Sequence, residues 1–249
     1  MVAQEQKTEF KFPTEIIELP SKGLLYPQDN PLSSGKIEMK YMTAVEEDIL
    51  TNQSYIQKGI VLDKLLQSLI VSKINYDDLV VGDKNAIMVA ARVLGYGKDY
   101  TFSYNEEEYT IDLSQIDNKP FNESLITPGV NEFSFTLPSS EVNVTFKILT
   151  HGDEKKIQNE LNGLKKINKD NTPELSTRLK YIITSVNGNQ DSKFIREFVT
   201  KFLLAKDSRA LREYIKEIQP DIDLTFFPNE KEKPVNIPVG ISFFWPDVE

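Results

Sequence analysis

One histidine, two pairs of neighbouring carboxylates and a few glycine-containing turns are the residues of this chain that could support chemistry. His151 is the only histidine among 249 residues, and there is no cysteine. A Ser-His-Asp triad would therefore have to use His151, and a zinc site made of histidine and cysteine ligands is excluded. The residue lies at the first position of an expected helix. We expect its side chain to face solvent, and we assign it no catalytic role.

The paired carboxylates Glu46-Glu47 and Asp153-Glu154 could suggest acid–base or metal chemistry. Adjacent residues on a helix do not face each other, however. Each pair begins three residues after a threonine, Thr43 or Thr150, which is the spacing of a capping box, and acids in a first turn complement the helix dipole. The pattern favours helix caps over catalysis. A hydrolase that uses Glu47 or Asp153 remains a remote alternative.

Three further patterns are better explained by turn chemistry than by ligand binding. The sequence LPSKG at Lys22-Gly23 lacks the spacing of a phosphate-binding loop, and the Gly95/Gly97 pair has no third glycine. The acidic stretch Asn105 to Glu108 lacks the alternating ligands and turn glycine of a calcium loop. We expect no catalytic residue, no cofactor and no metal.

Two apolar runs on irregular chain are candidates for contact with a partner protein. An apolar run of this kind either docks inside the fold or is left for a partner. The second run also lies near the chain end, where residues are often unburied, and it holds the only tryptophan. Core packing is the competing interpretation, and we favour it for the second run. The candidate partner-binding residues are Leu24, Leu25, Tyr26, Phe243, Phe244 and Trp245.

The composition is that of a folded, acidic protein. Hydrophobic residues make up 39% and charged residues 27% of the chain, which is enough for an ordinary core. The net charge of −9 argues against nucleic-acid binding, which needs basic surface to neutralise phosphates. No apolar run is long enough to span a bilayer, and residues 1–11 show no signal-peptide pattern. The sequence therefore predicts neither a nucleic-acid nor a membrane partner, and it leaves the oligomeric state open.

A stretch that occurs twice predicts the architecture. IEMKYMTAVEE begins at Ile37 and VTFKILTHGDE begins at Val144, so that Lys40 matches Lys147 and His151 matches Ala44. Two further blocks match in the same order: the LPS that precedes each copy, and an aspartate, Asp83 or Asp207, that is expected to cap a later helix. We predict an α+β fold of two related halves that arose by internal duplication, each with a strand, a cluster of helices and a β-hairpin.

Turn-forming residues set the predicted boundaries. The units are an extended segment over 1–36, a first α+β repeat over 37–113, a linker over 114–130 and a second repeat over 131–249. Residues 99–113 read as a hairpin with its tip at Asn105 to Glu108, and Asn105-Glu106 matches Asn229-Glu230 in the second half. Leu175, Leu179, Ile182 and Ile183 have the spacing of one helical stripe. Phe194, Phe198 and Phe202 predict a helix with weaker support in the first half. The tail from 235 to 246 is expected to form closing strands.

The residues from Glu18 to about Leu69 resemble a known family. ELPSKGLLYP, an Ile-Glu-Met-Lys strand, a Met-Thr-x-x-Glu-Glu-Asp-Ile-Leu turn into a helix and a leucine-rich helix are similar to the baseplate hub proteins of T-even-type bacteriophages, and the FFWP ending also fits. Some relatives carry cysteine pairs resembling a zinc ribbon in the hairpin. This chain has Tyr104 and Glu106 to Glu108 there, so no zinc function is carried over.

The resemblance implies a role in phage tail assembly, with other baseplate hub or tail proteins as partners. The family contains a structural hub subunit and a hub assembly catalyst, where "catalyst" means promoting assembly and no covalent chemistry. The presence of two complete halves favours a likeness to the assembly catalyst, which would act in the cytoplasm of the infected host. A subunit retained in the baseplate of the virion is the alternative. The family offers no catalytic residues to transfer.

Overall fold

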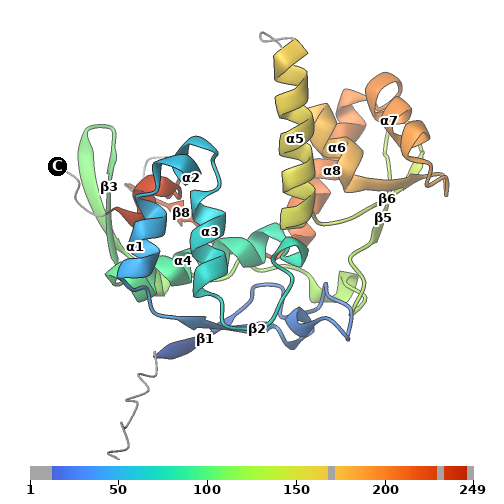
Figure 1. The fold of residues 1–249 in the computed structure, drawn as a ribbon. Helices are drawn as coiled ribbons and strands as arrows, with labels where there is room; N and C mark the ends of the chain where they lie inside the picture. Colours follow the sequence, from blue (N-terminus) through green and yellow to red (C-terminus); the bar gives the residue numbers. More distant parts are fainter. Residues whose placement is uncertain (1–12, 168–171, 229–232, 246–249) are drawn as a thin grey trace, which may run out of the picture.

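The computed structural model describes residues 13–167, 172–228 and 233–245, and it has the predicted α+β class. Figure 1 shows the helices of the first half on one side and those of the second half on the other, with β1 and β2 beneath. Buried apolar side chains from both halves nevertheless belong to one continuous core, with Leu66 and Ile87 from the first half and Val144 and Leu211 from the second.

The first half begins with two antiparallel strands that a glycine-containing turn connects. β1 pairs with β2 from Thr14 opposite Lys40 to Glu18 opposite Lys36. In the turn, Gly23 has a φ of +79° and lies against the carbonyl of Ser33, so that a side chain would both strain the backbone and collide with it. The elements of this part are β1 (Thr14–Glu18), the 3₁₀ turn η1 (Pro31–Ser34) and β2 (Lys36–Lys40).

The helices of the first half follow the predicted stripes, with one shifted start. Leu65, Leu66 and Leu69 of α3 are all fully buried. The prediction that Asp83 caps the next helix is wrong, because α4 begins two residues earlier and Asp83 is its third residue. A more distant loop uses that carboxylate. The elements are α1 (Ala44–Leu50), α2 (Gln53–Gln57), α3 (Val61–Leu69), the 3₁₀ turn η2 (Tyr76–Asp78) and α4 (Val81–Tyr96).

The predicted hairpin is present and is followed by irregular chain. β3 (Asp99–Tyr104) pairs with β4 (Glu107–Asp112). Asn105 and Glu106 form the two-residue turn with φ values of 51° and 68°, which is the left-handed geometry that such hairpins need. The predicted linker over 114–130 contains only part of one 3₁₀ turn, η3 (Leu113–Gln115), and a second, η4 (Glu123–Leu125).

The second half contains a three-stranded antiparallel sheet and four helices among its described residues. The expected helical stripe ends at Ile182, and the assignment of Ile183 to it is wrong. Ile183 begins β7, a strand of β-branched and small residues that pairs with β6. The elements are β5 (Phe133–Thr136), β6 (Asn143–Phe146), α5 (His151–Ile167), α6 (Glu174–Ile182), β7 (Ile183–Val186), α7 (Ser192–Lys201) and α8 (Ala205–Ile218).

The C-terminal segment returns to the first half. Asp221 accepts a backbone hydrogen bond from Lys119 at 2.8 Å, and Phe243 packs edge-to-face on Tyr100 at 4.7 Å. Gly82 allows the approach, because a side chain there would meet the carbonyl of Pro220. In the tail over 235–246, which was expected to form closing strands, the described residues contain one strand of two residues, β9 (Val235–Asn236), followed by a 3₁₀ turn, η5 (Ile241–Phe244). β9 pairs with β8 (Thr225–Phe226), which precedes the tail. Figure 1 shows β8 beside the first half. Asn229-Glu230 lies outside the described residues.

Candidate functional site

The first run of predicted partner-binding residues is largely inside the fold. Leu25 and Tyr26 are buried, and Leu24 is half-buried. Tyr26 donates its hydroxyl to a carboxylate oxygen of Asp83 at 2.6 Å and accepts the backbone N–H of Val80 at 3.0 Å. Burial and the neighbouring charge of Asp83 raise the pKa of Tyr26 well above its ordinary value. Of this run, only Leu24 keeps side-chain surface that a partner could reach.

Asp83 holds the turn that precedes this run. Ser21 donates both its backbone N–H, at 2.9 Å, and its hydroxyl, at 2.7 Å, to the Asp83 carboxylate. Burial raises the pKa of Asp83, and the donors from Ser21 and Tyr26 only partly offset that effect. In the second half the same arrangement recurs, since Asp207 accepts the backbone N–H groups of Ser139 at 2.7 Å and Ser140 at 3.1 Å. LPS and a helical aspartate therefore form one structural unit in each half.

The second run of predicted partner-binding residues closes the core. Phe243 and Phe244 are fully buried, and Trp245 is half-buried against the same core. Arg92, itself buried, donates to the carbonyl of Phe243 at 2.9 Å. This placement agrees with core packing, the competing interpretation of the aromatic tail. Trp245 alone retains partial access to solvent.

The two copies of the repeated stretch adopt the same geometry. Lys40 and Lys147 lie 2.7 and 2.8 Å from Glu46 and Asp153, and each of these acids also accepts the backbone N–H of its capping threonine. Ser68 donates a further hydrogen bond to Glu46 at 2.7 Å. Burial by itself would raise the pKa of Glu46, but the donors from Lys40, Thr43 and Ser68 outweigh it and lower the pKa to about 2. These matched contacts are consistent with an internal duplication. That the two halves arose in this way stays a prediction.

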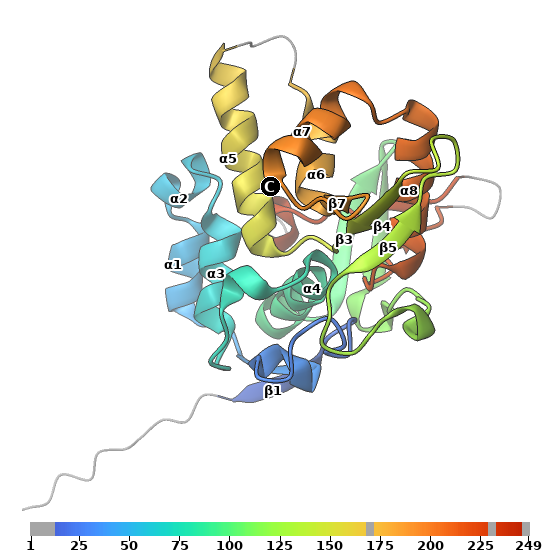
Figure 2. The same ribbon diagram turned by 90° about the vertical axis from the view of Figure 1, so that its right-hand side faces the viewer.

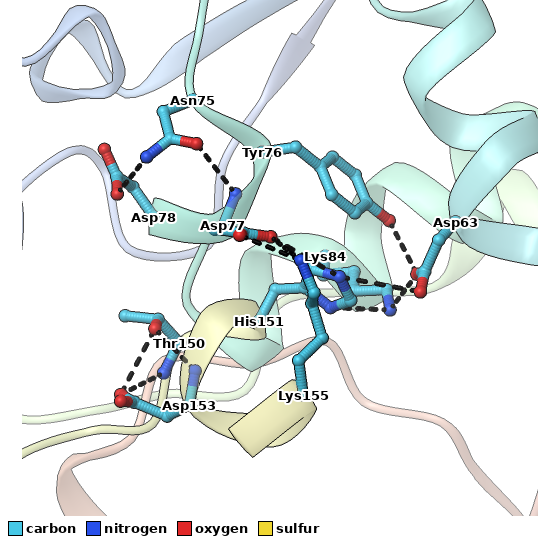
Figure 3. A network of polar contacts seen from close by, with 10 residues as sticks. All are labelled: Asp63, Asn75, Tyr76, Asp77, Asp78, Lys84, Thr150, His151, Asp153 and Lys155. Carbon is cyan, nitrogen blue, oxygen red and sulfur yellow. Dashed lines mark hydrogen bonds and ion pairs between the residues drawn. The ribbon is translucent and has the colours of Figure 1, made fainter. Parts of the chain in front are cut away.

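His151 does not face solvent, and that prediction is wrong. The side chain is only 4% exposed, because the start of α5 packs against η2 of the first half and His151 donates its backbone N–H to Leu79 at 2.7 Å. Its ring meets the edge of Tyr76 at 4.7 Å. The ring nitrogens lie 3.2 Å from Lys84 Nζ and 3.5 Å from an Asp63 carboxylate oxygen (Figure 3).

The contacts of His151 with Tyr76, Lys84 and Asp63 form a polar junction between the two halves. They leave little of the imidazole ring accessible to solvent. Burial and the charge of Lys84 lower the pKa of His151, although Asp63 and Asp77 act in the opposite direction. Lys155 of the second half also binds Asp77 of the first at 2.9 Å (Figure 3). Because the ring is enclosed by groups from both halves, we interpret this junction as a structural contact between them.

The carboxylates of the hydrolase alternative serve the fold. Asp153 is buried and engaged by Lys147 and Thr150, and Glu47 is exposed in the first turn of α1. Among the described residues, no three histidine, cysteine or acidic side chains are grouped so that they could hold a metal ion. In the same parts of the chain, every helix is too short or too polar to cross a bilayer.

An exposed apolar surface on α7 was missed as a site by the sequence analysis. Phe194 and Phe202 are 42% and 61% exposed, and with Phe198 they follow one face of α7. They line a groove of about 270 Å³, which we call the α7 groove. The i, i+4, i+8 spacing of the phenylalanines was visible, but spacing does not tell which of them is covered. The groove is lined by Val142, Val186, Asn187, Phe194, Glu197, Phe198 and Phe202.

Comparisons of this chain with family models, with curated proteins and with solved structures found no match.

Proposed function

We propose that this protein is a non-enzymatic assembly factor that binds other proteins of a phage tail and promotes formation of the baseplate hub. The observation that carries the proposal is the run from Glu18 to about Leu69, from ELPSKGLLYP to the leucine-rich helix, which resembles baseplate hub proteins of T-even-type phages. It implies that the protein acts in the cytoplasm of the infected host.

The contacts of this run are consistent with a family signature that specifies a fold. Ser21 and Tyr26 both donate hydrogen bonds to Asp83. Lys40 and Thr43 both donate hydrogen bonds to Glu46. Because these residues are tied to buried carboxylates, their side chains are engaged within this fold. Partner recognition is then left to exposed side chains elsewhere, and exposed apolar groups of the kind found on α7 are typical of protein-binding surfaces.

The proposal is tested by removing the protein during infection. Without it, baseplate hubs should fail to assemble, and supplying the chain from a plasmid should restore them. An inactive plasmid copy, for instance one carrying Phe243→Asp in the core, is the matched control. Normal hubs in the absence of the chain would contradict the proposal.

A structural hub subunit retained in the virion is the alternative, because the same signature occurs in both kinds of family member. Quantitative mass spectrometry of purified particles distinguishes the two. An assembly factor should be missing from finished particles or present far below one copy per hub. A fixed ratio to other hub proteins would favour the subunit.

A further inference from the structure

The start of α5 is tied to the first half by two backbone hydrogen bonds. His151 donates its N–H to the carbonyl of Leu79 at 2.7 Å, and Val81 donates its N–H to the carbonyl of Leu149 at 3.1 Å. The two bonds enclose an isolated antiparallel β-bridge between residues 80 and 150. Figures 1 and 2 both show the start of α5 next to the beginning of α4. Opening of this bridge would release the start of α5 from the first half, and the two N–H groups would report it.

The polar contacts beside this bridge require a neutral imidazole. A lysine ammonium can only donate, so the contact of 3.2 Å between Lys84 Nζ and His151 Nδ1 uses the lone pair of that nitrogen (Figure 3). The proton of the ring then lies on Nε2, which is 3.5 Å from a carboxylate oxygen of Asp63. A second proton, on Nδ1, would point a donor at the Lys84 ammonium and break the contact between them.

The charges around the ring already balance while the ring is neutral. Lys84 is paired with Asp63 at 2.7 Å, and Lys155 is paired with Asp77 at 2.9 Å. A proton on His151 would add a positive charge beside these two ion pairs, on a ring that is buried. Among the described residues, the charged and titratable groups that face the ring are Asp63 on α3, Tyr76 and Asp77 in η2, Lys84 on α4 and Lys155 on α5.

These contacts set the direction of a response to pH. Burial and the charge of Lys84 lower the pKa of His151, so the closed bridge favours the neutral ring. The contribution of the ring to the closed bridge is therefore present above the ordinary value of 6.5 and is lost as pH falls through the lowered pKa. The apolar core that both halves share contains no group that titrates in this range. The loss should therefore be confined to the bridge.

We propose that the bridge between residues 79–81 and 149–151 is a pH-sensitive latch, which is closed while His151 is neutral and opens when the imidazole takes up a proton. This latch follows from the contacts of the polar junction and does not depend on the proposed assembly function. His151 is the only histidine, so its NMR signal needs no assignment among several. The test follows that signal and the hydrogen exchange of backbone amides in the full chain from about pH 5 to about pH 8.

The ring should titrate with a midpoint below 6.5, and the exchange protection of the Val81 and His151 amides should fall through the same midpoint. A midpoint about one unit below the ordinary value corresponds to an about tenfold loss of protection once the ring is protonated. Protection factors are compared, because the intrinsic exchange rate itself changes with pH. The amide of Leu113, which donates to the carbonyl of Lys98 at 2.8 Å within the first half, should keep its protection.

Three variants test the role of the charges. Lys84→Met removes the cation beside Nδ1 and leaves Asp63 without its lysine, so the histidine midpoint should rise by about one unit. Lys58→Met is the matched control, because it removes the same charge from an exposed position that does not face the ring, and it should leave the midpoint unchanged. His151→Gln keeps a polar side chain that gains no proton, so the protection of the Val81 amide should no longer depend on pH.

A wild-type midpoint at or above 6.5, or a ring that stays neutral down to about pH 5, overturns the inference. Unchanged protection of the Val81 and His151 amides while the ring titrates overturns it as well. A parallel loss of protection at Leu113 would mean that acid unfolds the whole chain and that no separate latch exists. An equal shift of the midpoint in Lys84→Met and Lys58→Met would also contradict the latch. The wild-type titration needs no variant, so it decides the matter even if a variant fails to fold.

Discussion

An aspartate at the third position of a helix holds the loop before each half, but the two halves support this contact differently. Asp83 of α4 accepts two hydrogen bonds from Ser21 and one from the Tyr26 hydroxyl, whereas Asp207 of α8 accepts two backbone N–H groups. The first loop is longer, because η1 separates it from β2. The extra donors match this greater length: a long loop needs more contacts to hold it than a tight turn between strands does.

The repeated stretch shows the same asymmetry. Glu46 reaches a lysine, a threonine and Ser68 of α3, whereas the shorter Asp153 reaches only the lysine and the threonine at hydrogen-bond distance. The helix in the first half is therefore tied to its neighbour through the cap, while α5 is tied to the other half through His151. One local pattern thus serves two different tertiary contacts.

The largest effect is expected from the residues that the chain end supplies to the first half. Phe243→Ala removes a fully buried ring and should lower the free energy of unfolding by about 3–5 kcal/mol. Phe227→Ala, at an exposed position, should change it by no more than about 0.5 kcal/mol. Urea titration measures both. A loss below about 1 kcal/mol for Phe243→Ala would contradict the placement of the tail in the core.

The second-largest loss of stability is expected from replacing the loop aspartates, Asp83 and Asp207. Asp83→Ala leaves three donors without an acceptor and should cost about 3–4 kcal/mol, while Asp207→Ala leaves two and should cost about 2–3 kcal/mol. Urea unfolding of the two variants, beside Asp191→Ala at an exposed helix cap, gives the comparison. Equal costs at Asp83 and Asp207 would remove the asymmetry between the loops.

A reciprocal exchange tests the position at which the halves differ most. His151→Ala should cost about 2 kcal/mol, because it removes the ring between Tyr76 and Asp63 and leaves a cavity at the junction. Ala44→His, at the matching exposed position, should change stability by no more than about 0.5 kcal/mol. Thermal unfolding of both variants measures the difference. Similar losses of stability in His151→Ala and Ala44→His would mean that the buried contacts of His151 do not stabilise the protein.

The capping acids should differ by a smaller amount. Glu46→Gln keeps the shape but removes the charge that binds Lys40, and should cost about 2 kcal/mol, against about 1 kcal/mol for Asp153→Asn. Unfolding experiments at neutral pH measure the two costs. Equal costs would mean that Ser68 adds nothing to the first cap.

The smallest expected effect is an opposite pH dependence of the two loop aspartates. The raised pKa of Asp83 makes its contribution fully present below the ordinary value of 3.8, and that contribution is lost as pH rises through the folded pKa. The hydrogen bonds to Asp207 outweigh burial and lower its pKa, so its contribution is present above 3.8 and is lost as pH falls through the folded pKa.

Unfolding measured from pH 3 to 7 separates these two contributions (about the range in which aspartates titrate). The stability advantage of the wild type over Asp83→Asn should shrink as pH rises, and its advantage over Asp207→Asn should grow. The same slope in both comparisons would contradict the asymmetry.

Short-range patterns determined much of the fold from the sequence alone. The T-x-x-E spacing gave the cap at Thr43, and a charged tip between alternating strands gave the hairpin. The predicted tip from Asn105 to Glu108 was too long, because Glu107 and Glu108 already belong to β4 and the turn is Asn105-Glu106. These signals depend on neighbours a few residues away, so the sequence contains them in full. The LPS match between Ser21 and Ser139 also identified equivalent positions, because both turns use the same backbone donors.

Only the tertiary structure decided which of the candidate residues are accessible. His151 looked exposed because a first helical position usually is, yet the first half covers it. Ile183 fitted a helical stripe, but pairing with β6 made it a strand. Phe243 is buried and Phe202 is exposed, although both are aromatic residues next to apolar neighbours. Burial depends on which distant segments meet, and that information is not local. For this reason the α7 groove became visible only once the chain was folded.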